Sequence, residues 1–268
     1  MSRPITGFPY LDEPEGVIAF AHRGGARHPE IPGIENTLAA FEHAVALGYT
    51  YLETDVHATS DGVLLAFHDD VLDRVTDLRG VIYEQAYVDV AAARIGGSHA
   101  IPKLDDLLEA FPEQRFNIDI KSRGAIEPLA RLIEARGAYH RVCVGSFDEG
   151  VIRAFRRRIA RPVATACGPV AAVATRAGAP VRGLLRDGGV AFQVPHRTRG
   201  VVLVTSQFIR RAHAAGRHVH VWTVDDPEEM RELLDLGVDG LITDRTDLLR
   251  EVLVERGQWP TTGRGSRT

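Results

Sequence analysis

Acidic, basic and imidazole side chains occur close together at four points in the first half of the chain. The four points are His22-Arg23, Glu53-Thr54-Asp55, His68-Asp69 and Asp119-Ile120-Lys121, and each lies in or directly after a short apolar run. Side chains two residues apart on a strand point to the same face. We therefore expect Glu53 to share a face with Asp55, and Asp119 to share one with Lys121.

Three carboxylates brought together in an apolar environment repel one another and become protonated unless a cation lies among them. The sequence therefore predicts that Glu53, Asp55 and Asp119 bind one divalent cation. Oxygen ligands favour Mg²⁺ or Ca²⁺, with Mn²⁺ also possible, although the nearby imidazoles do not exclude zinc.

Two basic residues, Arg23 and Lys121, would place fixed positive charge beside this cation. A guanidinium, an ammonium and a metal ion can share the oxygens of a phosphate group. His22 and His68 could then remove and supply protons, because an imidazole with a pKa of about 6.5 suits both roles near neutral pH. These residue types indicate metal-assisted chemistry on a phosphate ester.

Short apolar runs alternate with amphipathic stretches along nearly the whole chain, a pattern typical of a parallel sheet with crossover helices. Nine runs have the length of strands: Val17–Ala21, Tyr51–Val56, Val63–Phe67, Phe116–Ile120, Arg141–Ser146, Pro162–Ala166, Val190–Val194, His218–Thr223 and Gly240–Thr243. Eight stretches are predicted helices: Ile34–Leu47, Leu104–Ala110, Ala125–Ala135, Glu149–Arg158, Val170–Ala177, Ser206–Ala215, Pro227–Leu236 and Thr246–Glu255.

The run Val63–Phe67 follows its predecessor too closely to be parallel to it. Residues 57–62 form a hairpin-sized connection with an Asp-Gly turn signal, whereas a parallel crossover needs about a dozen residues. We expect this strand to return antiparallel and to bring His68 to the level of Asp55. Eight parallel strands and eight helices remain, which predicts an α/β protein with a TIM (β/α)8 barrel.

The predicted barrel is one domain that covers residues 17–256. A short N-terminal extension, 1–16, precedes it, and a polar C-terminal tail, 257–268, follows it. Residues from about 69 to 100 fit neither repeat, so we expect a short insertion after the hairpin of the second strand. Barrel enzymes carry their active sites at the C-terminal ends of the strands, which is where the titratable residues gather.

The composition excludes several classes of protein. The 268 residues are 44% hydrophobic and 25% charged, with a net charge of −4 and no block of basic residues. We therefore expect neither a nucleic-acid partner nor stable membrane association. Cys143 and Cys167 lie in apolar surroundings without metal-binding spacing and are predicted to be core thiols. No leader or membrane-spanning run is apparent, so we expect a cytoplasmic protein.

The ordered motifs of the chain resemble those of the glycerophosphodiester phosphodiesterases. The resemblance spans about residues 17–253, and the ordered set is far more specific than any one motif. Its members are His22-Arg23-Gly24, Glu35-Asn36-Thr37, Glu53-x-Asp55-Val56, Asp61-Gly62 followed by His68-Asp69, Trp222-Thr223-Val224, Gly237-Val238-Asp239-Gly240 and Thr243-Asp244.

This resemblance implies a barrel enzyme that binds one divalent cation and hydrolyses small glycerophosphodiesters to sn-glycerol 3-phosphate and an alcohol, as part of lipid and glycerol metabolism. By position, His22 and His68 correspond to the family's acid/base pair, and Glu53 and Asp55 correspond to its metal ligands. Arg23 and Lys121 correspond to its phosphate contacts, and Trp222 corresponds to the wall of its pocket. Asp119 takes the place of the family's third metal ligand.

Two positions depart from the family pattern. Asp119 stands where a glutamate is usual, so this metal ligand is one methylene shorter. Asp225 stands where an asparagine is usual and adds a negative charge near the rim. Two alternatives stay open: a phospholipase D-like enzyme that acts on lysophospholipid or sphingomyelin and needs an apolar lip, and a non-catalytic barrel that serves as a binding module.

Overall fold

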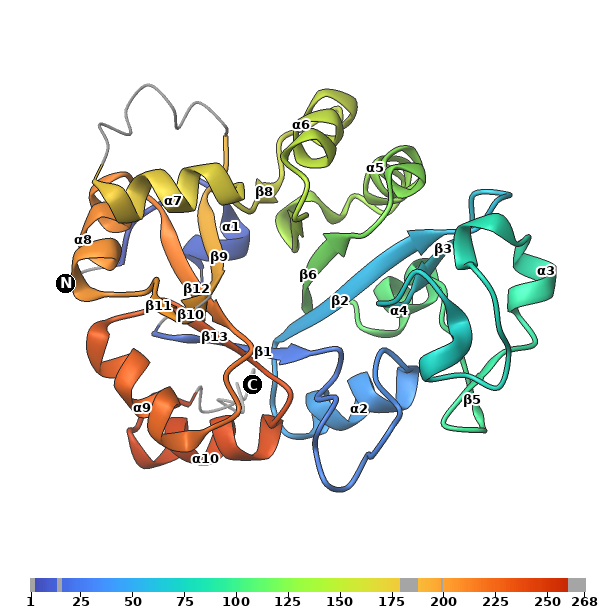
Figure 1. Cartoon of the computed structure of the whole chain (residues 1–268), viewed down its shortest axis with the longest axis horizontal. Helices are drawn as coiled ribbons and strands as arrows, with labels where there is room; N and C mark the ends of the chain where they lie inside the picture. Colours follow the sequence, from blue (N-terminus) through green and yellow to red (C-terminus); the bar gives the residue numbers. More distant parts are fainter. Residues whose placement is uncertain (1–2, 14–15, 179–187, 199, 260–268) are drawn as a thin grey trace, which may run out of the picture.

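The computed structural model describes residues 3–13, 16–178, 188–198 and 200–259. Eight parallel strands lie side by side in the order β8-β7-β6-β2-β1-β13-β12-β9, and a single bridge from Ala166 to Ala191 joins the two end strands. The predicted TIM barrel is confirmed, and it is nearly closed (Figure 1). Its strands are β1 (Ile18–His22), β2 (Tyr51–Ala58), β6 (Arg115–Ile120), β7 (Val142–Gly145), β8 (Ala164–Thr165), β9 (Ala191–Pro195), β12 (His218–Trp222) and β13 (Gly240–Thr243).

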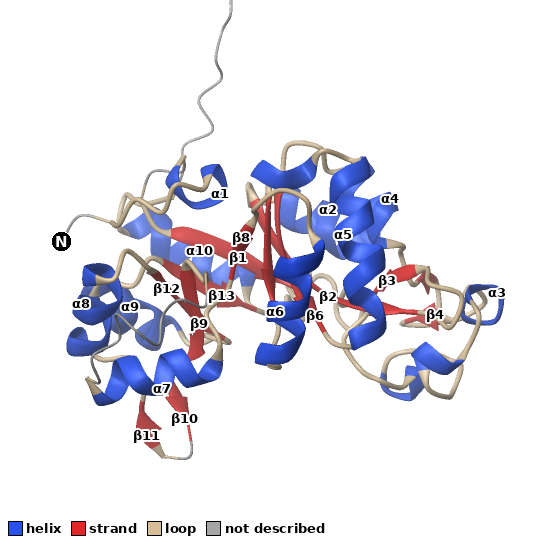
Figure 2. Cartoon of the chain, turned by 90° about the horizontal axis from the view of Figure 1, so that it is seen from above, coloured by secondary structure: helices blue, strands red, loops and turns tan. Residues whose placement is uncertain are grey.

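Helices cover the outside of the barrel (Figure 2). Each of the eight predicted helices is present: α2 (Leu38–Ala46), α4 (Leu104–Ala110), α5 (Ile126–Ala135), α6 (Glu149–Arg158), α7 (Pro169–Ala177), α8 (Ser206–Ala214), α9 (Pro227–Leu236) and α10 (Thr246–Glu255). Within the described residues, none of the helices is both long and apolar enough to span a bilayer. Cys143 and Cys167 are buried and form no disulfide, as predicted.

Helix α2 begins four residues later than its sequence pattern predicts. Asn36 has a φ of 58°, in the left-handed region that a right-handed helix cannot include. Thr37 is the N-cap, and its Oγ1 accepts a hydrogen bond from the backbone N–H of Ala40 at 3.2 Å. The turn at Asn36 leaves the preceding residue, Glu35, outside the helix and free to face the barrel mouth.

The short strand β3 (Leu64–Ala66) pairs antiparallel with β2, as the hairpin argument predicts. Val56 lies opposite Ala66, and the N–H of Phe67 donates to the carbonyl of Asp55 at 3.0 Å. His68, the residue after Phe67, is therefore close to Asp55 where the chain leaves the hairpin.

The segment after β3 has a small apolar core of its own and projects from one end of the molecule (Figure 2). Its elements are η1 (Leu72–Arg74), η2 (Ile82–Glu84), α3 (Tyr87–Val90), β4 (Arg94–Ile95) and β5 (His99–Ala100). The buried members of this core are Leu65, Phe67, Leu72, Ile82, Val90, Ala93, Ile95 and Ile101. This packing gives the side chains of η1 fixed positions beside the barrel mouth.

The chain before β1 covers the N-terminal end of the barrel. Helix α1 (Pro9–Asp12) buries Tyr10 and Leu11 against Phe20 and Tyr51, and Arg3 donates to the carbonyl of Leu11 at 2.9 Å. At the other terminus Trp259 packs on Tyr49, with ring centroids 5.0 Å apart. The predicted tail beyond Trp259 lies outside the described residues. The end closed by α1 is opposite the end where the parallel strands finish.

Candidate active site

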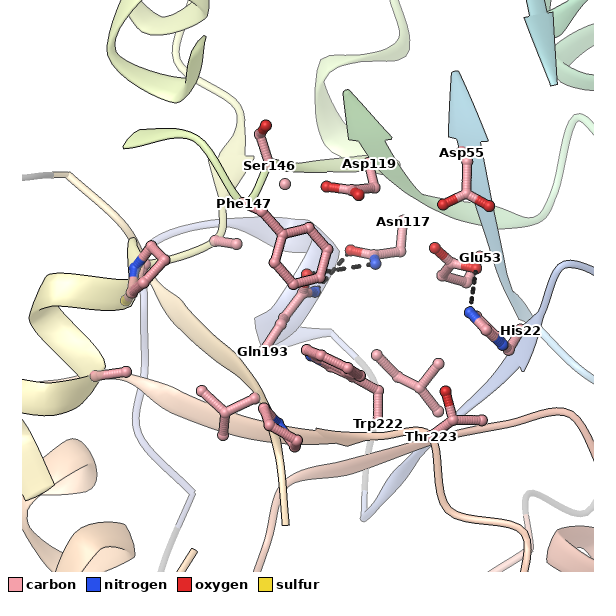
Figure 3. A pocket seen from close by; sticks show the side chains of 18 of the residues that line it. His22, Glu53, Asp55, Asn117, Asp119, Ser146, Phe147, Gln193, Trp222 and Thr223 are labelled. Atoms are coloured by element: carbon pink, nitrogen blue, oxygen red, sulfur yellow. Dashed lines mark hydrogen bonds and ion pairs between the residues drawn. The ribbon is translucent and has the colours of Figure 1, made fainter. Parts of the chain in front are cut away.

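A pocket of about 460 Å³ lies at the C-terminal ends of the barrel strands. All eight residues that the sequence nominates as site residues line it: His22, Arg23, Glu53, Asp55, His68, Asp119, Lys121 and Trp222. They come from four strands and from the hairpin after β2. The chain thus brings residues 200 positions apart into one cavity (Figure 3).

His22 ends strand β1 and is held between two carboxylates. Its Nδ1 lies 2.6 Å from Oδ1 of Asp244, the residue after the neighbouring strand β13, and its Nε2 lies 3.7 Å from Oε2 of Glu53 (Figure 3). Desolvation opposes the charged imidazolium, but the charge of Glu53 and the bond to Asp244 outweigh it and raise the pKa of His22. Asp244 fixes the ring so that Nε2 faces the pocket.

A carboxylate also holds the ring of His68. Its Nδ1 lies 2.5 Å from Oδ1 of Asp69, and Oδ2 of Asp69 accepts a hydrogen bond from Nε of Arg74 at 2.5 Å. Burial raises the pKa of Asp69, but the bonds from Arg74 and His68 prevail and lower it to about 2. Asp69 is therefore ionised, and it orients the imidazole of His68.

Arg23 occupies a strained backbone position, with a φ of 51°. Its Nε lies 3.1 Å from Oδ2 of Asp55, and its Nη1 donates to Oε1 of Glu35 at 3.1 Å. The backbone N–H of Asn36 donates to the carbonyl of Arg23, and the amide of Asn36 donates to Oδ2 of Asp55 at 3.3 Å. Two carboxylates and a backbone bond therefore fix this guanidinium at the barrel mouth.

Lys121 lies between two carboxylates on neighbouring strands. Asp55 on β2 and Asp119 on β6 are register partners, and Nζ of Lys121 lies 2.8 Å from Oδ1 of Asp55 and 2.7 Å from Oδ2 of Asp119. Desolvation favours the neutral acid, but Lys121 and Arg23 overcome it and lower the pKa of Asp55. The ammonium thus occupies the centre of the acidic cluster.

The other two carboxylates of the cluster have less compensating charge. Burial and the charge of Asp55 raise the pKa of Glu53 to about 7, and burial raises the pKa of Asp119 despite Lys121. Buried carboxylates that are short of positive charge are a donor set that a divalent cation fits. Nζ of Lys121 bonds to both Asp55 and Asp119, so a cation held by these carboxylates would share them with the ammonium.

The other half of the pocket is largely apolar, although Asn117, Ser146, Gln193, Thr198 and Thr223 also line the pocket. Trp222 at the end of β12 packs edge-on against Phe147, with ring centroids 5.4 Å apart, and Lys121 lies over the Phe147 ring (Figure 3). Phe147 is 62% exposed and Val173 is 66% exposed, so this wall continues onto the surface. The remaining apolar lining comprises Ala166, Cys167, Pro169, Ala172, Val194, Pro195, Leu203 and Ile242.

Several residues hold the site together through contacts that the sequence does not predict. Asp69 and Asp244 belong to the motifs His68-Asp69 and Thr243-Asp244, but those motifs do not show which residues the two carboxylates contact. Glu35 falls in the predicted helix Ile34–Leu47, and its motif does not show that it accepts hydrogen bonds from Arg23 and Arg74. Asp225, expected to add charge at the rim, accepts from the N–H of Asp244 at 2.9 Å and so fixes that residue. Arg74 gave no sequence signal, because its contacts depend on the packing of the insertion.

A sequence model of the glycerophosphoryl diester phosphodiesterase family matches residues 22–248. A Mycobacterium tuberculosis protein named probable glycerophosphodiester phosphodiesterase 2 is 44% identical over 91% of this chain and 93% of its own length. Human lysophospholipase D GDPD1 is 27% identical, covering 87% and 85% of the two chains.

A solved structure has the same fold. It is an Oleispira antarctica phosphodiesterase in complex with the product sn-glycerol-3-phosphate, with a TM-score of 0.75 and 21% identity over 89% of this chain and 97% of that one. The barrel, the pocket and the family match over most of the chain agree with one another. The chain therefore belongs to the glycerophosphoryl diester phosphodiesterase family and is an enzyme rather than a non-catalytic barrel.

Proposed function

We propose that the enzyme hydrolyses glycerophosphodiesters to sn-glycerol 3-phosphate and an alcohol, with His22 and His68 as its acid/base pair. One observation carries this proposal: both imidazoles line the same pocket, and each has Nδ1 bonded to a carboxylate, at 2.6 Å and 2.5 Å. Such a carboxylate orients the ring. Nε2 of each ring is then the atom that exchanges protons with the substrate.

Arg23 and Lys121 would bind the phosphate of the diester, since both cations line the same pocket as the histidines. One histidine takes the proton from the attacking hydroxyl, for which we propose the 2-hydroxyl of the substrate's own glycerol. The other histidine gives a proton to the leaving alkoxide. Water then opens the cyclic phosphate, and the two histidines exchange roles.

Glu53, Asp55 and Asp119 would hold a divalent cation, with Mg²⁺, Ca²⁺ and Mn²⁺ as candidates. When bound, such a cation polarises the phosphoryl oxygens and stabilises the charge that develops on them. The raised pKa values of Glu53 and Asp119 support this assignment, because both carboxylates are short of positive charge in the protein alone. The cytoplasmic location and the absence of nucleic-acid and membrane partners stay predictions.

The test is the release of sn-glycerol 3-phosphate from glycerophosphocholine. His22→Gln and His68→Gln are each expected to lower kcat by roughly 10² to 10⁴. His140→Gln is the control and should keep normal turnover, because His140 is exposed and does not line the pocket. Dialysis against EDTA should abolish turnover, and Mg²⁺, Ca²⁺ or Mn²⁺ should restore it. Near-normal turnover of either active-site variant contradicts the two-histidine scheme, and full turnover in EDTA contradicts the metal assignment.

A second candidate substrate is lysophospholipid, and the apolar half of the pocket favours it. Phe147 and Val173 are largely exposed beside Trp222, which gives an acyl chain an apolar path from the catalytic groups to the surface. If the enzyme uses this path, Phe147→Ser with Val173→Ser lowers kcat/KM for lysophosphatidylcholine and leaves that for glycerophosphocholine unchanged. Equal changes for the two substrates would exclude an acyl path.

A further inference from the structure

Two imidazoles and a carboxylate form a second cluster of metal-binding groups outside the active-site pocket. His28 and Glu30 lie in the loop between β1 and α2, and His43 lies on α2. One possible ligand atom of each residue lies within 4.8 Å of those of the other two. None of the three residues lines the pocket.

Contacts within this cluster hold the three side chains close together. The rings of His28 and His43 have centroids 4.3 Å apart, and Nε2 of His43 lies 3.0 Å from Oε2 of Glu30. Nδ1 of His43 is buried and has no hydrogen-bond partner within the described residues. The ring of His43 is therefore held mainly by Glu30 and by the imidazole of His28.

The charge state of the cluster also suits a cation. His28 is 4% exposed, and its Nδ1 accepts a hydrogen bond from the backbone N–H of Glu30, so the ring is in its neutral form. Asp247 on α10 adds a further negative charge nearby, balanced by its ion pair with Arg245. The cluster therefore offers the neutral imidazole of His28 and the exposed carboxylate of Glu30, and both groups can bind a positive ion.

We propose that His28, Glu30 and His43 bind a divalent transition-metal ion of the zinc class. Two nitrogen donors favour such ions over Mg²⁺ and Ca²⁺, and two histidines with one glutamate are a known zinc ligand set that leaves a position for water. The bound ion would join the loop that carries Arg23 to helix α2. This site is distinct from the proposed active-site cation, which has oxygen ligands only.

The proposal also specifies a local rearrangement. In the metal-free protein Nδ1 of His28 accepts a hydrogen bond from the backbone N–H of Glu30 at 3.1 Å. A neutral ring that accepts at Nδ1 carries its proton on Nε2. Ligation through Nε2 moves that proton to Nδ1, and ligation through Nδ1 occupies the accepting lone pair, so a metal ion at either nitrogen breaks the bond to Glu30. Metal binding should therefore shift the backbone amide resonance of Glu30 and speed its hydrogen exchange.

The experiment is calorimetric titration of the full, metal-stripped chain with Zn²⁺, repeated with Co²⁺ to follow its visible absorption band. Asp55→Asn serves as the background, because it removes a carboxylate from the active-site cluster. We expect about one Zn²⁺ per chain to remain bound in this background. His43→Gln and Glu30→Gln should each weaken that binding by at least about 10-fold, the scale at which even outer-shell partners of metal ligands act.

His140→Gln in the same background is the matched control, since it also removes a surface histidine. Both ligand variants change exposed or partly exposed side chains, so circular dichroism should show them folded. Unchanged Zn²⁺ affinity in His43→Gln and Glu30→Gln would overturn the proposal. Loss of all Zn²⁺ binding in Asp55→Asn alone would do so too, and would assign the ion to the active site.

Discussion

The guanidinium of Arg74 forms two hydrogen bonds with the carboxylate of Glu35, from Nη1 to Oε2 at 2.9 Å and from Nη2 to Oε1 at 2.7 Å. The same guanidinium holds Asp69, the carboxylate that orients His68, and Glu35 in turn holds Arg23. One residue of the insertion therefore connects the proposed acid/base group to the proposed phosphate-binding group.

Arg74→Gln should lower kcat on glycerophosphocholine by roughly 10- to 100-fold, because Asp69 and Glu35 lose the cation that fixes them. KM should rise less, since Arg23 and Lys121 remain in place. Steady-state kinetics measure both constants. Arg79→Gln, which removes an exposed arginine from the same insertion, is the control and should change neither. Equal kinetics in the two variants would show that the link through Arg74 has no catalytic effect.

Asp244→Asn tests the other imidazole. The amide can present an N–H to Nδ1 of His22, which forces the proton to Nε2 and leaves the ring unable to accept one from the substrate. We expect kcat to fall by roughly 10² to 10⁴ with the fold intact. Turnover and thermal unfolding should be measured on the same preparation, with Asp235→Asn on α9 as the control. Normal turnover would mean that Asp244 does not set the tautomer.

The barrel could be predicted from the sequence because its signals are local. Alternation of apolar runs and amphipathic helices, and the short connection at residues 57–62, depend only on nearby residues. That the eight nominated residues lie in one pocket was predictable for a related reason, since the ends of parallel strands meet at one end of a barrel. The late start of α2 was not, because it depends on the left-handed backbone of Asn36.

The residues that orient the site could not be predicted in the same way. Glu35 and Arg74 are 39 positions apart, and their contact exists only because the insertion packs beside the barrel mouth. Asp244 reaches His22 because β1 and β13 are neighbours in the nearly closed barrel, and no local pattern specifies that these two side chains bond. Sequence patterns predict which groups lie in the pocket more readily than which groups hold them there.

Gly24→Ala should destabilise the turn that carries His22 and Arg23. Gly24 has a φ of 84°, and a Cβ there would lie 2.7 Å from Cβ and 2.8 Å from the carbonyl carbon of Ala40. The left-handed backbone costs an alanine about 1–2 kcal/mol, and the clash with α2 adds about 1–3 kcal/mol. Urea unfolding measures the free energy of unfolding.

Gly33→Ala is the matched control for this loop. Gly33 also has a positive φ, 75°, but a Cβ there would have no atom within 4 Å. It should therefore lose only the backbone contribution and keep normal turnover. An equal loss of stability in Gly24→Ala and Gly33→Ala would show that the contact with Ala40 relaxes without cost.

His220 should make the stability of the fold depend on pH. It is fully buried against Phe20, and neither ring nitrogen has a hydrogen-bond partner within the described residues. Desolvation, with the neighbouring His218, holds its pKa well below the ordinary 6.5. As the pH falls below 6.5 the unfolded chain binds a proton here and the folded chain does not. The stability contributed by the neutral ring is thus complete above pH 6.5 and declines below it, by about 1.4 kcal/mol per pH unit.

His220→Phe keeps an aromatic ring against Phe20 and removes this titration. The free energy of unfolding in urea, measured from pH 7.5 to 5.5, should therefore fall less steeply in His220→Phe than in the wild type. His218, whose pKa is also lowered by burial, supplies part of the remaining slope in both proteins. His140→Gln, at an exposed position, should keep the wild-type slope. Parallel curves for the wild type and His220→Phe would mean that the buried ring takes up its proton without unfolding, and that the barrel interior admits a charge.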